Sequence, residues 1–238
     1  MSAIALQAMR SRRLPPGLVI FDCDGVLIDS EPLCDRVVSA ELRTLGWVMT
    51  PEECGRRFIG MSFYDMVPLI EAQIGQRLVT DWIAGLVAKV ALAMAEEVEM
   101  VPGARDALEA TTALGLPWCI ASNSSHQEMA AKFGRTGLAE LVAGRQHSSD
   151  DVIALGGRGK PAPDLFLTVA TAAGVAPARC VVIEDSLHGV RAAMAAGMDC
   201  LGFSPHGDGA HLASAGAAPF HDLAVLPKLL RAALRTGA

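Results

Sequence analysis

Residues 18–26, LVIFDCDGV, decide how this chain folds and where its chemistry lies. Leu18 to Cys23 form a short, largely apolar run rich in β-forming residues, which is typical of a central strand buried on both faces of a parallel sheet. The run ends in an Asp-x-Asp-Gly turn that carries Asp22 and Asp24. Because ligands bind at the carboxyl ends of strands in open parallel sheets, both aspartates are expected at a binding edge.

Two further strand-like runs also end in polar residues. These runs and the residues that follow them are Leu116 to Ala121 with Ser122 and Asn123, and Cys180 to Ile183 with Glu184 and Asp185. Cys200 to Phe203 is a further candidate strand, and glycines such as Gly115 and Gly174 end the helical segments between the runs. Strands that alternate with helices predict an α/β fold, with a Rossmann-like parallel sheet and helices on both of its faces.

Between residues 30 and 100 the pattern changes to helices, and no strand-like run appears. Pro32 suits an early helical position, and Thr50-Pro51-Glu52-Glu53 resembles a capping box with proline at the first helical position. The start and stop signals predict an inserted domain of about four helices over residues 30–100. The α/β core is predicted to comprise residues 17–29 and 101–238.

The two segments that most resemble targeting or membrane sequences are both interpreted otherwise. The first sixteen residues, MSAIALQAMRSRRLPP, lack the continuous apolar stretch of a secretory signal, and a flexible tail or a misassigned start codon is expected rather than a targeting peptide. Trp82 to Ala95 contains Lys89 and is shorter than the roughly 20 apolar residues that span a bilayer. It is therefore expected to be a packed helix, and no membrane partner is predicted.

Net charge and cysteine usage indicate which binding partners and which cellular compartment to expect. The formal net charge of −6 argues against binding to nucleic acid, which usually requires a clustered basic surface. The six cysteines are scattered without a C-x-x-C pair, and several fall inside apolar runs. They are interpreted as free buried thiols in a reducing compartment, which favours the cytoplasm. We expect a monomer or a weak homodimer.

Four carboxylates would meet at one edge of the predicted sheet, namely those of Asp22, Asp24, Glu184 and Asp185. Such a cluster requires a cation among its members, because like charges at close range disfavour ionisation. Oxygen ligands, with few histidines and no cysteine pair nearby, favour Mg²⁺ over zinc. Lys160, in the segment GKPAPD, would supply a second positive charge.

The order of these residues resembles the haloacid dehalogenase-like superfamily. Four motifs match in sequence, namely D-x-D-G-V at Asp22 to Val26, a serine after the second strand at Ser122, the lysine of GKPAPD at Lys160, and the acidic pair of VVIEDS at Glu184-Asp185. The resemblance covers nearly everything from Leu18 to Phe203. The strings FDCDGVLIDSEP and EDSLHGVRAAMAAGM resemble the β-phosphoglucomutase-like branch, and the helical insertion looks like that family's α-helical cap.

The resemblance implies a Mg²⁺-dependent phosphatase that hydrolyses a small phosphorylated metabolite, a sugar phosphate or sugar-acid phosphate, through an aspartyl-phosphate intermediate. Asp22 would be the nucleophile, and Asp24 would be the general acid and base. Ser122, Asn123 and Lys160 would bind the phosphoryl oxygens. The implied metal ligands are Asp22, the backbone carbonyl of Asp24, Asp185, and Glu184 as a direct or water-mediated contact.

Each of these residues also has a purely structural interpretation. Asp-x-Asp-Gly can be a simple turn, Ser122 to Ser125 can merely cap a helix, and Lys160 can be a solvated surface charge. Their ordered conjunction favours the catalytic interpretation. A non-catalytic metabolite-binding protein on the same scaffold is the alternative from another class, and the presence of both Asp22 and Asp24 argues against it.

A β-phosphoglucomutase-type phosphosugar mutase is a nearer alternative, because its core motifs are the same. That family's cap carries basic residues where this chain has Ile59 and Phe63, and its histidine near the general acid falls at Cys34. These departures favour hydrolysis over return of the phosphoryl group. Phe58, Ile59 and Phe63 can equally form the core of the cap. The candidates for substrate choice are Arg56, Arg57, Met61, Ser62 and Phe63.

Overall fold

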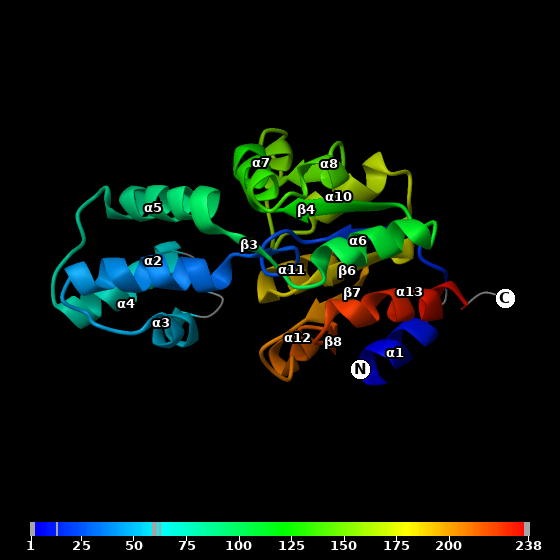
Figure 1. Ribbon diagram of the computed structural model, residues 1–238, viewed down its shortest axis with the longest axis horizontal. Helices are drawn as coiled ribbons and strands as arrows, with labels where there is room; N and C mark the ends of the chain where they lie inside the picture. The colour runs from blue at the N-terminus through cyan, green and yellow to red at the C-terminus, as the bar shows by residue number, and fades with distance from the viewer. Residues whose placement is uncertain (1–2, 13, 59–60, 62, 236–238) are drawn as a thin grey trace. The chain divides into compact units, whose positions relative to one another are not determined.

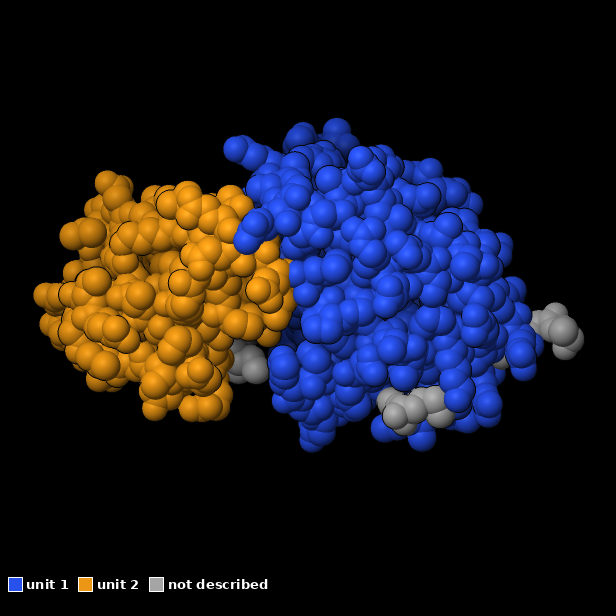
Figure 2. All heavy atoms as spheres, in the orientation of Figure 1, with its two compact units in different colours: residues 1–28, 100–238 blue, residues 29–99 orange. Residues whose placement is uncertain are grey.

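The chain divides into two compact units (Figure 2), and the computed structural model describes its residues 3–12, 14–58, 61 and 63–235. Unit 1 comprises Met1–Ile28 and Met100–Ala238, and unit 2 comprises Asp29–Glu99. The chain passes between the units within two short strands that pair with each other, β2 (Ile28–Asp29) and β3 (Glu99–Met100).

Unit 1 is built on a parallel sheet (Figure 1). Among the described residues the sheet has six strands, in the order β5-β4-β1-β6-β7-β8. Each neighbouring pair runs parallel. In that order, the strands are Gln146–Ser148, Trp118–Ser122, Leu18–Phe21, Cys180–Glu184, Asp199–Phe203 and Ala218–Phe220. The structure therefore confirms the predicted Rossmann-like α/β fold.

Helices cover both faces of this sheet. On one face, Leu18 and Ile20 of β1 belong to an apolar cluster with residues of α10 and α11, such as Leu165. On the other face, Phe21 packs edge-on against Trp118, with ring centroids 6.1 Å apart, and the indole N–H of Trp118 donates to Thr112 of α6 (2.8 Å).

The helices of unit 1 are α1 (Ala3–Arg10), α6 (Ala104–Ala113), α7 (His126–Arg135), α8 (Ala139–Val142), α9 (Ser149–Ile153), α10 (Asp164–Ala172), α11 (Leu187–Ala195), α12 (Ala210–Ser214) and α13 (Leu226–Leu234), with 3₁₀ turns η1 (Pro177–Arg179) and η2 (Leu223–Val225).

Unit 2 is helical, as predicted. Its core contains Leu42, Ile70 and Leu86, each at most 1% exposed. The predicted capping box is present, since the N–H of Glu53 donates to Oγ1 of Thr50 (3.2 Å) and the N–H of Thr50 donates to Glu53 (2.8 Å). In the described part of the unit the helices are four, α2 (Glu31–Thr44), α3 (Pro51–Phe58), α4 (Phe63–Ile74) and α5 (Trp82–Glu97).

Two further expectations concern membranes and thiols. The apolar segment Trp82 to Ala95 lies within α5, and no helix in the described ranges is long and apolar enough to cross a bilayer. The six cysteines are free, and all except Cys34 are buried. The prediction of free, largely buried thiols is therefore confirmed.

The N-terminal segment differs from the expected flexible tail. Residues Ala3–Arg10 form α1, which packs against α13 and β8. Ala5 and Met9, one helical turn apart, are 0% and 1% exposed. Beyond the helix, the buried guanidinium of Arg12 forms an ion pair with Asp199 and donates to the carbonyl of Ala178 (3.1 Å). The expectation was wrong because this short segment has an apolar stripe whose partner surface lies more than two hundred residues away in sequence.

The packing of α1 generates a stability prediction. We expect Met9→Ala to lower the free energy of unfolding by about 2–3 kcal/mol, because it deletes a buried side chain from a packed interface. Ile4→Ala is the matched control, since Ile4 lies in the same helix but is 63% exposed, and it should change stability by less than about 0.5 kcal/mol. Urea denaturation measures both values. Equal effects would show that α1 does not dock as described.

Candidate active site

The carboxyl ends of the central strands bring the predicted site residues together. The N–H of Asp22 donates to the carbonyl of Ile183 (2.9 Å), which continues the ladder between β1 and β6 by one residue. Phe21 lies opposite Ile183 on one side and Ile120 on the other. Asp22 therefore stands level with Glu184, and Ser122 lies close by at the end of β4.

Lys160 lies at the centre of this group. Its Nζ donates to Oδ1 of Asp22 (2.6 Å), to Oε1 of Glu184 (2.8 Å) and to the carbonyl of Ala121 (2.8 Å). Its side chain is 4% exposed and lies over the ring of Phe166. Burial alone lowers the pKa of Lys160, but Asp22 and Glu184 raise it further, so its pKa lies above the usual value. Lys160 is therefore a buried ammonium group rather than a solvated surface charge.

Three carboxylates of the group are arranged as a candidate metal centre. Asp22, Glu184 and Asp185 each present an oxygen, and these oxygens lie within 4.8 Å of one another. Burial raises the pKa of Asp22 to about 7; Lys160 opposes this rise, whereas Glu184 adds to it. A bound cation would favour the charged forms of these groups, and a set of oxygen donors fits Mg²⁺.

Two glycines provide the space that these carboxylates occupy. A Cβ at Gly25 would lie 1.8 Å from Oδ2 of Asp185, and the φ of Gly25 is +76°, a region that L-residues rarely adopt. A Cβ at Gly189 would lie 1.5 Å from Oε1 of Glu184. The glycine of the Asp-x-Asp-Gly turn is therefore required by both the backbone conformation and the neighbouring acid.

Glu184 is held at both of its oxygens. Besides the bond from Lys160, its Oε2 accepts hydrogen bonds from the N–H and the hydroxyl of Ser186 (both 2.9 Å). The same hydroxyl accepts the N–H of Gly189 (3.0 Å) and so caps α11. Because Glu184 is fully buried and already accepts these bonds, Asp185 is better placed than Glu184 to bind a metal directly.

Asn123 supports Lys160 through its side chain. Its amide Nδ2 donates to the carbonyl of Lys160 (3.0 Å), and its Oδ1 accepts the backbone N–H of Lys160 (2.9 Å). Ser122 is buried, and its Oγ accepts the N–H of Ser124 (3.0 Å). The cap of α7 is Ser125, which forms a capping box with Glu128. The helix-capping alternative therefore applies to Ser125 and not to Ser122.

Asp24 has a partner that the sequence analysis missed. The Nζ of Lys132, on α7, donates to Oδ1 and Oδ2 of Asp24 (2.7 and 2.8 Å), and Ser124 donates to Oδ2 (2.8 Å). Burial lowers the pKa of Lys132, but Asp24 raises it more, so the pKa is above the usual value. Met129 and Phe133, three residues before Lys132 and one after it, are fully buried. A lysine on this apolar helical face is the signal that would have indicated a buried ion pair.

The candidates for substrate choice belong to unit 2. Arg56 and Arg57 are exposed on α3. Phe58 is 6% exposed, and Met61 and Phe63 pack against the same apolar core. This agrees with the alternative that Phe58 and Phe63 form part of the core of the helical insertion. Ile59 and Ser62 lie outside the described residues.

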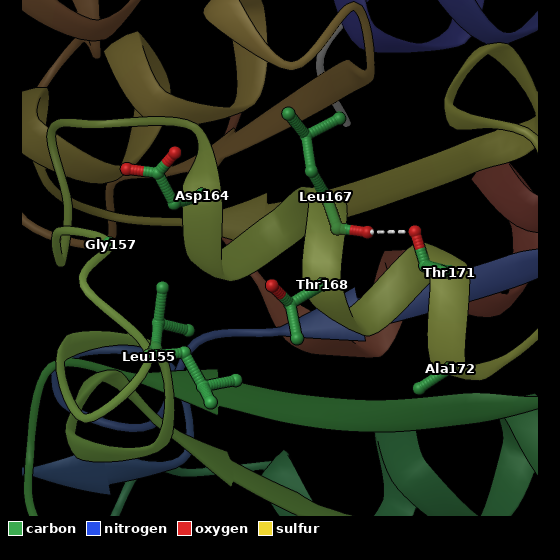
Figure 3. A pocket seen from close by; sticks show the side chains of 8 residues that line it. Leu155, Gly157, Asp164, Leu167, Thr168, Thr171 and Ala172 are labelled. Atoms are coloured by element: carbon green, nitrogen blue, oxygen red, sulfur yellow. Dashed lines mark hydrogen bonds between the residues drawn. The ribbon is translucent and has the colours of Figure 1, made fainter.

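A separate hollow on unit 1 contains none of the predicted site residues. It has a volume of about 520 Å³ and lies between α10 and the segment after α9 (Figure 3). The hydroxyl of Thr171 points into its own helix and donates to the carbonyl of Leu167 (2.8 Å). The hollow is lined by Val152, Leu155, Gly157, Asp164, Leu167, Thr168, Thr171 and Ala172. Asp164 is the one charged group in this lining, so the hollow does not offer the converging charges that phosphate chemistry requires.

The position of Gly189 generates a second prediction. We expect Gly189→Ala to lower the free energy of unfolding by roughly 2 kcal/mol or more, because the new methyl group would displace a buried carboxylate from its partners. Gly134→Ala is the control, since Gly134 is also helical but a Cβ there meets nothing within 4 Å. That change should stabilise the protein by about 0.5–1 kcal/mol. Chemical denaturation compares the two; a Gly189 variant as stable as the wild type would contradict the packing around Glu184.

Comparisons with known proteins agree with the geometry. The family model described as haloacid dehalogenase-like hydrolase matches residues 16–197. The chain is 30% identical over 215 residues to the 6-phosphogluconate phosphatase of Escherichia coli, covering 90% of this chain and 94% of that protein. It is also 30% identical over 205 residues to a phosphorylated carbohydrates phosphatase of Thermotoga maritima, covering 84% and 91% of the two chains.

Comparisons with solved structures also find similar haloacid dehalogenase-like proteins and hydrolases. A haloacid dehalogenase-like protein from Agrobacterium tumefaciens is 34% identical with a TM-score of 0.83, covering 91% of this chain and 98% of that chain. A hydrolase from Deinococcus radiodurans with bound phosphate and sodium is also 34% identical, with a TM-score of 0.80 and coverage of 94% and 99%. A putative β-phosphoglucomutase from Thermotoga maritima is 28% identical with a TM-score of 0.72, covering 90% and 98%.

Proposed function

This chain belongs to the haloacid dehalogenase-like hydrolase family, and from that premise we propose that it is a Mg²⁺-dependent phosphatase that acts on a small sugar phosphate or sugar-acid phosphate. The observation that carries the proposal is the buried cluster of Asp22, Lys160 and Glu184, with Asp185 beside it, at the carboxyl ends of adjacent strands. The names of the relatives reported above, which act on phosphorylated carbohydrates, support the substrate class.

The proposed reaction has two steps. A carboxylate oxygen of Asp22 attacks phosphorus, the bond between phosphorus and the ester oxygen breaks, and Asp24 donates a proton to the departing oxygen. Water then attacks the phosphorus of the aspartyl-phosphate and gives a proton to Asp24, and the bond between phosphorus and Asp22 breaks. Inorganic phosphate leaves, and both aspartates return to their starting states.

The remaining residues would hold the phosphoryl group and its charge. Mg²⁺, held by Asp22, Asp185 and the backbone carbonyl of Asp24, would neutralise negative charge on the phosphoryl oxygens. Lys160 would supply a fixed positive charge, and the hydroxyl of Ser122 would donate a hydrogen bond. Since the amide side chain of Asn123 is bonded to Lys160, any contact of Asn123 with phosphate would come from its backbone N–H.

The contacts of Lys160 decide which variants test this mechanism. Lys160→Ala would leave the buried carboxylate of Glu184 without its ammonium partner, a change that typically costs roughly 3–5 kcal/mol. Loss of activity in that variant would therefore not separate catalysis from folding. Asp22→Asn keeps the size of the side chain and leaves Lys160 paired with Glu184, so it is the cleaner probe.

We expect the wild-type protein to release inorganic phosphate from a panel of sugar phosphates and sugar-acid phosphates, including 6-phosphogluconate, when Mg²⁺ is present. Activity should disappear after chelation with EDTA and return when Mg²⁺ is added. Asp22→Asn should fall below detection because it lacks the nucleophile, and Asp24→Asn should lose turnover because it lacks the proton donor. A colorimetric phosphate assay measures each case. Full turnover by Asp22→Asn would refute the aspartyl-phosphate mechanism.

We also expect hydrolysis to exceed isomerisation when the substrate is β-glucose 1-phosphate with its bisphosphate activator. Ile59 and Phe63 stand where the mutase family carries basic residues, and Cys34 stands where it carries a histidine. A second phosphate group would therefore be held poorly, and water should accept the phosphoryl group. Glucose 6-phosphate formed is compared with inorganic phosphate released. Predominant glucose 6-phosphate would replace the phosphatase assignment with a phosphosugar mutase.

A further inference from the structure

We propose that Lys132, assisted by Ser124, is a positioning residue that holds Asp24 in a single orientation for both proton transfers. The proposal rests on the phosphatase mechanism above and adds a residue to it. It assigns different tasks to the two oxygens of Asp24, because one of them is held more tightly than the other.

The contacts form a closed set of three groups. The Nζ of Lys132 lies 2.7 Å from Oδ1 and 2.8 Å from Oδ2 of Asp24, and 3.0 Å from Oγ of Ser124. The hydroxyl of Ser124 in turn donates to Oδ2 (2.8 Å). Oδ2 therefore accepts two hydrogen bonds from fixed groups, whereas Oδ1 accepts one. We assign Oδ1 as the oxygen that exchanges its proton with the leaving group and with water.

Lys132 is more deeply buried than the carboxylate that it binds. The side chain of Lys132 is 8% exposed, whereas that of Asp24 is 31% exposed. The carboxylate therefore remains accessible from one side while its ammonium partner is shielded from water. Within the described residues, Asp24 is the carboxylate that forms an ion pair with Lys132. A shielded ammonium group holds its counterion more strongly than a solvated surface pair does.

The backbone that carries Lys132 and Ser124 is itself fixed. The hydroxyl of Ser148, at the end of β5, donates to the carbonyl of Ser124 (2.8 Å). The capping box of Ser125 fixes the first turn of α7, and Met129 packs in the core one turn before Lys132. Because strand, cap and helix are all held, the ammonium group does not have to be ordered during catalysis.

The basicity of the leaving group predicts for which substrates Lys132 matters. An aliphatic monoester releases a strongly basic alkoxide, so cleavage depends on a proton delivered from Oδ1 of Asp24 as the bond breaks. 4-Nitrophenyl phosphate releases a weakly basic phenolate, so formation of the aspartyl-phosphate needs little assistance from an acid. Loss of Lys132 should therefore harm the first step with aliphatic substrates far more than with the nitrophenyl ester.

The test compares Lys132→Met with Lys132→Arg in single-turnover experiments that follow release of the leaving group. The substrates are 4-nitrophenyl phosphate and the aliphatic monoester of the panel that the wild type hydrolyses fastest. Lys132→Met should slow the aliphatic reaction by about 100-fold or more, which is the low end of general acid catalysis. It should slow the nitrophenyl reaction by less than about 10-fold. Lys132→Arg should restore part of the aliphatic rate, and KM, measured separately at steady state, should stay within about 3-fold in both variants.

A double-mutant cycle separates positioning from a general structural effect. In the Asp24→Asn background, the cycle is measured with 4-nitrophenyl phosphate, whose cleavage needs little assistance from an acid, and Lys132→Met should cause no further loss, because residues that act as one unit are not additive. Lys228→Met, which removes an exposed lysine on α13, should leave both reactions unchanged. If Lys132→Met does not fold, Ser124→Ala carries the test, with a smaller loss that shows the same preference for aliphatic substrates.

The outcomes distinguish this proposal from the function on which it rests. Equal loss on both substrates, or an additive loss in the Asp24→Asn background, would show that Lys132 has only a structural role. Either result would overturn the positioning role while leaving the phosphatase assignment intact. A wild-type protein that releases no phosphate with Mg²⁺ would overturn the phosphatase assignment, and the role of Lys132 with it.

Discussion

The burial of carboxylates at the carboxyl ends of β1 and β6 is the constraint on which the rest of the site depends. Asp22 is 7% exposed and Glu184 is completely buried. Moving an ion from water into a protein interior costs several kcal/mol unless a partner compensates it. Lys160 provides this compensation by donating to both carboxylates. The position of Lys160 then depends on Asn123, and the orientation of Glu184 depends on Ser186. The side chains of Asn123 and Ser186 thus hold the groups that compensate the buried charges.

The fold could be predicted because its determinants are local. The runs around Leu18, Trp118 and Cys180 are short, apolar and followed by polar turns, and each became a parallel strand of the central sheet. The helices of unit 2 carry caps, such as the one at Thr50, that can be identified within a few residues. The helix α1 was missed for the opposite reason, because the stability of its apolar stripe comes from α13 at the other end of the chain.

The carboxylates and Lys160 of the candidate site could be expected from the sequence, but Lys132, Ser124 and several contacts could not. The placement of Asp22 and Glu184 follows from the rule that ligands bind at strand ends, and Lys160 was expected as the positive charge among them; the structure brings these residues together. Two contacts could not be predicted, that of the Asn123 side chain with the backbone of Lys160 and that of Lys132 with Asp24. Both depend on which loop or helix lies beside which strand end in the folded chain. Residue spacing does not contain that information. A lysine on an apolar helical face indicates that a counterion exists, but not which one.

The balance of charge would link the proposed metal centre to the proposed substrate. Burial raises the pKa of Asp22 to about 7, and Glu184 adds to this rise even though Lys160 opposes it. One ammonium group therefore does not fully offset the cost of ionising Asp22 in this position. A phosphate monoester brings up to two further negative charges at neutral pH. A divalent cation beside Asp22 and Asp185 would stabilise the ionised nucleophile and attract the phosphate at the same time. Under the proposed mechanism, the cation that keeps Asp22 ionised would thus also attract the phosphorylated substrate.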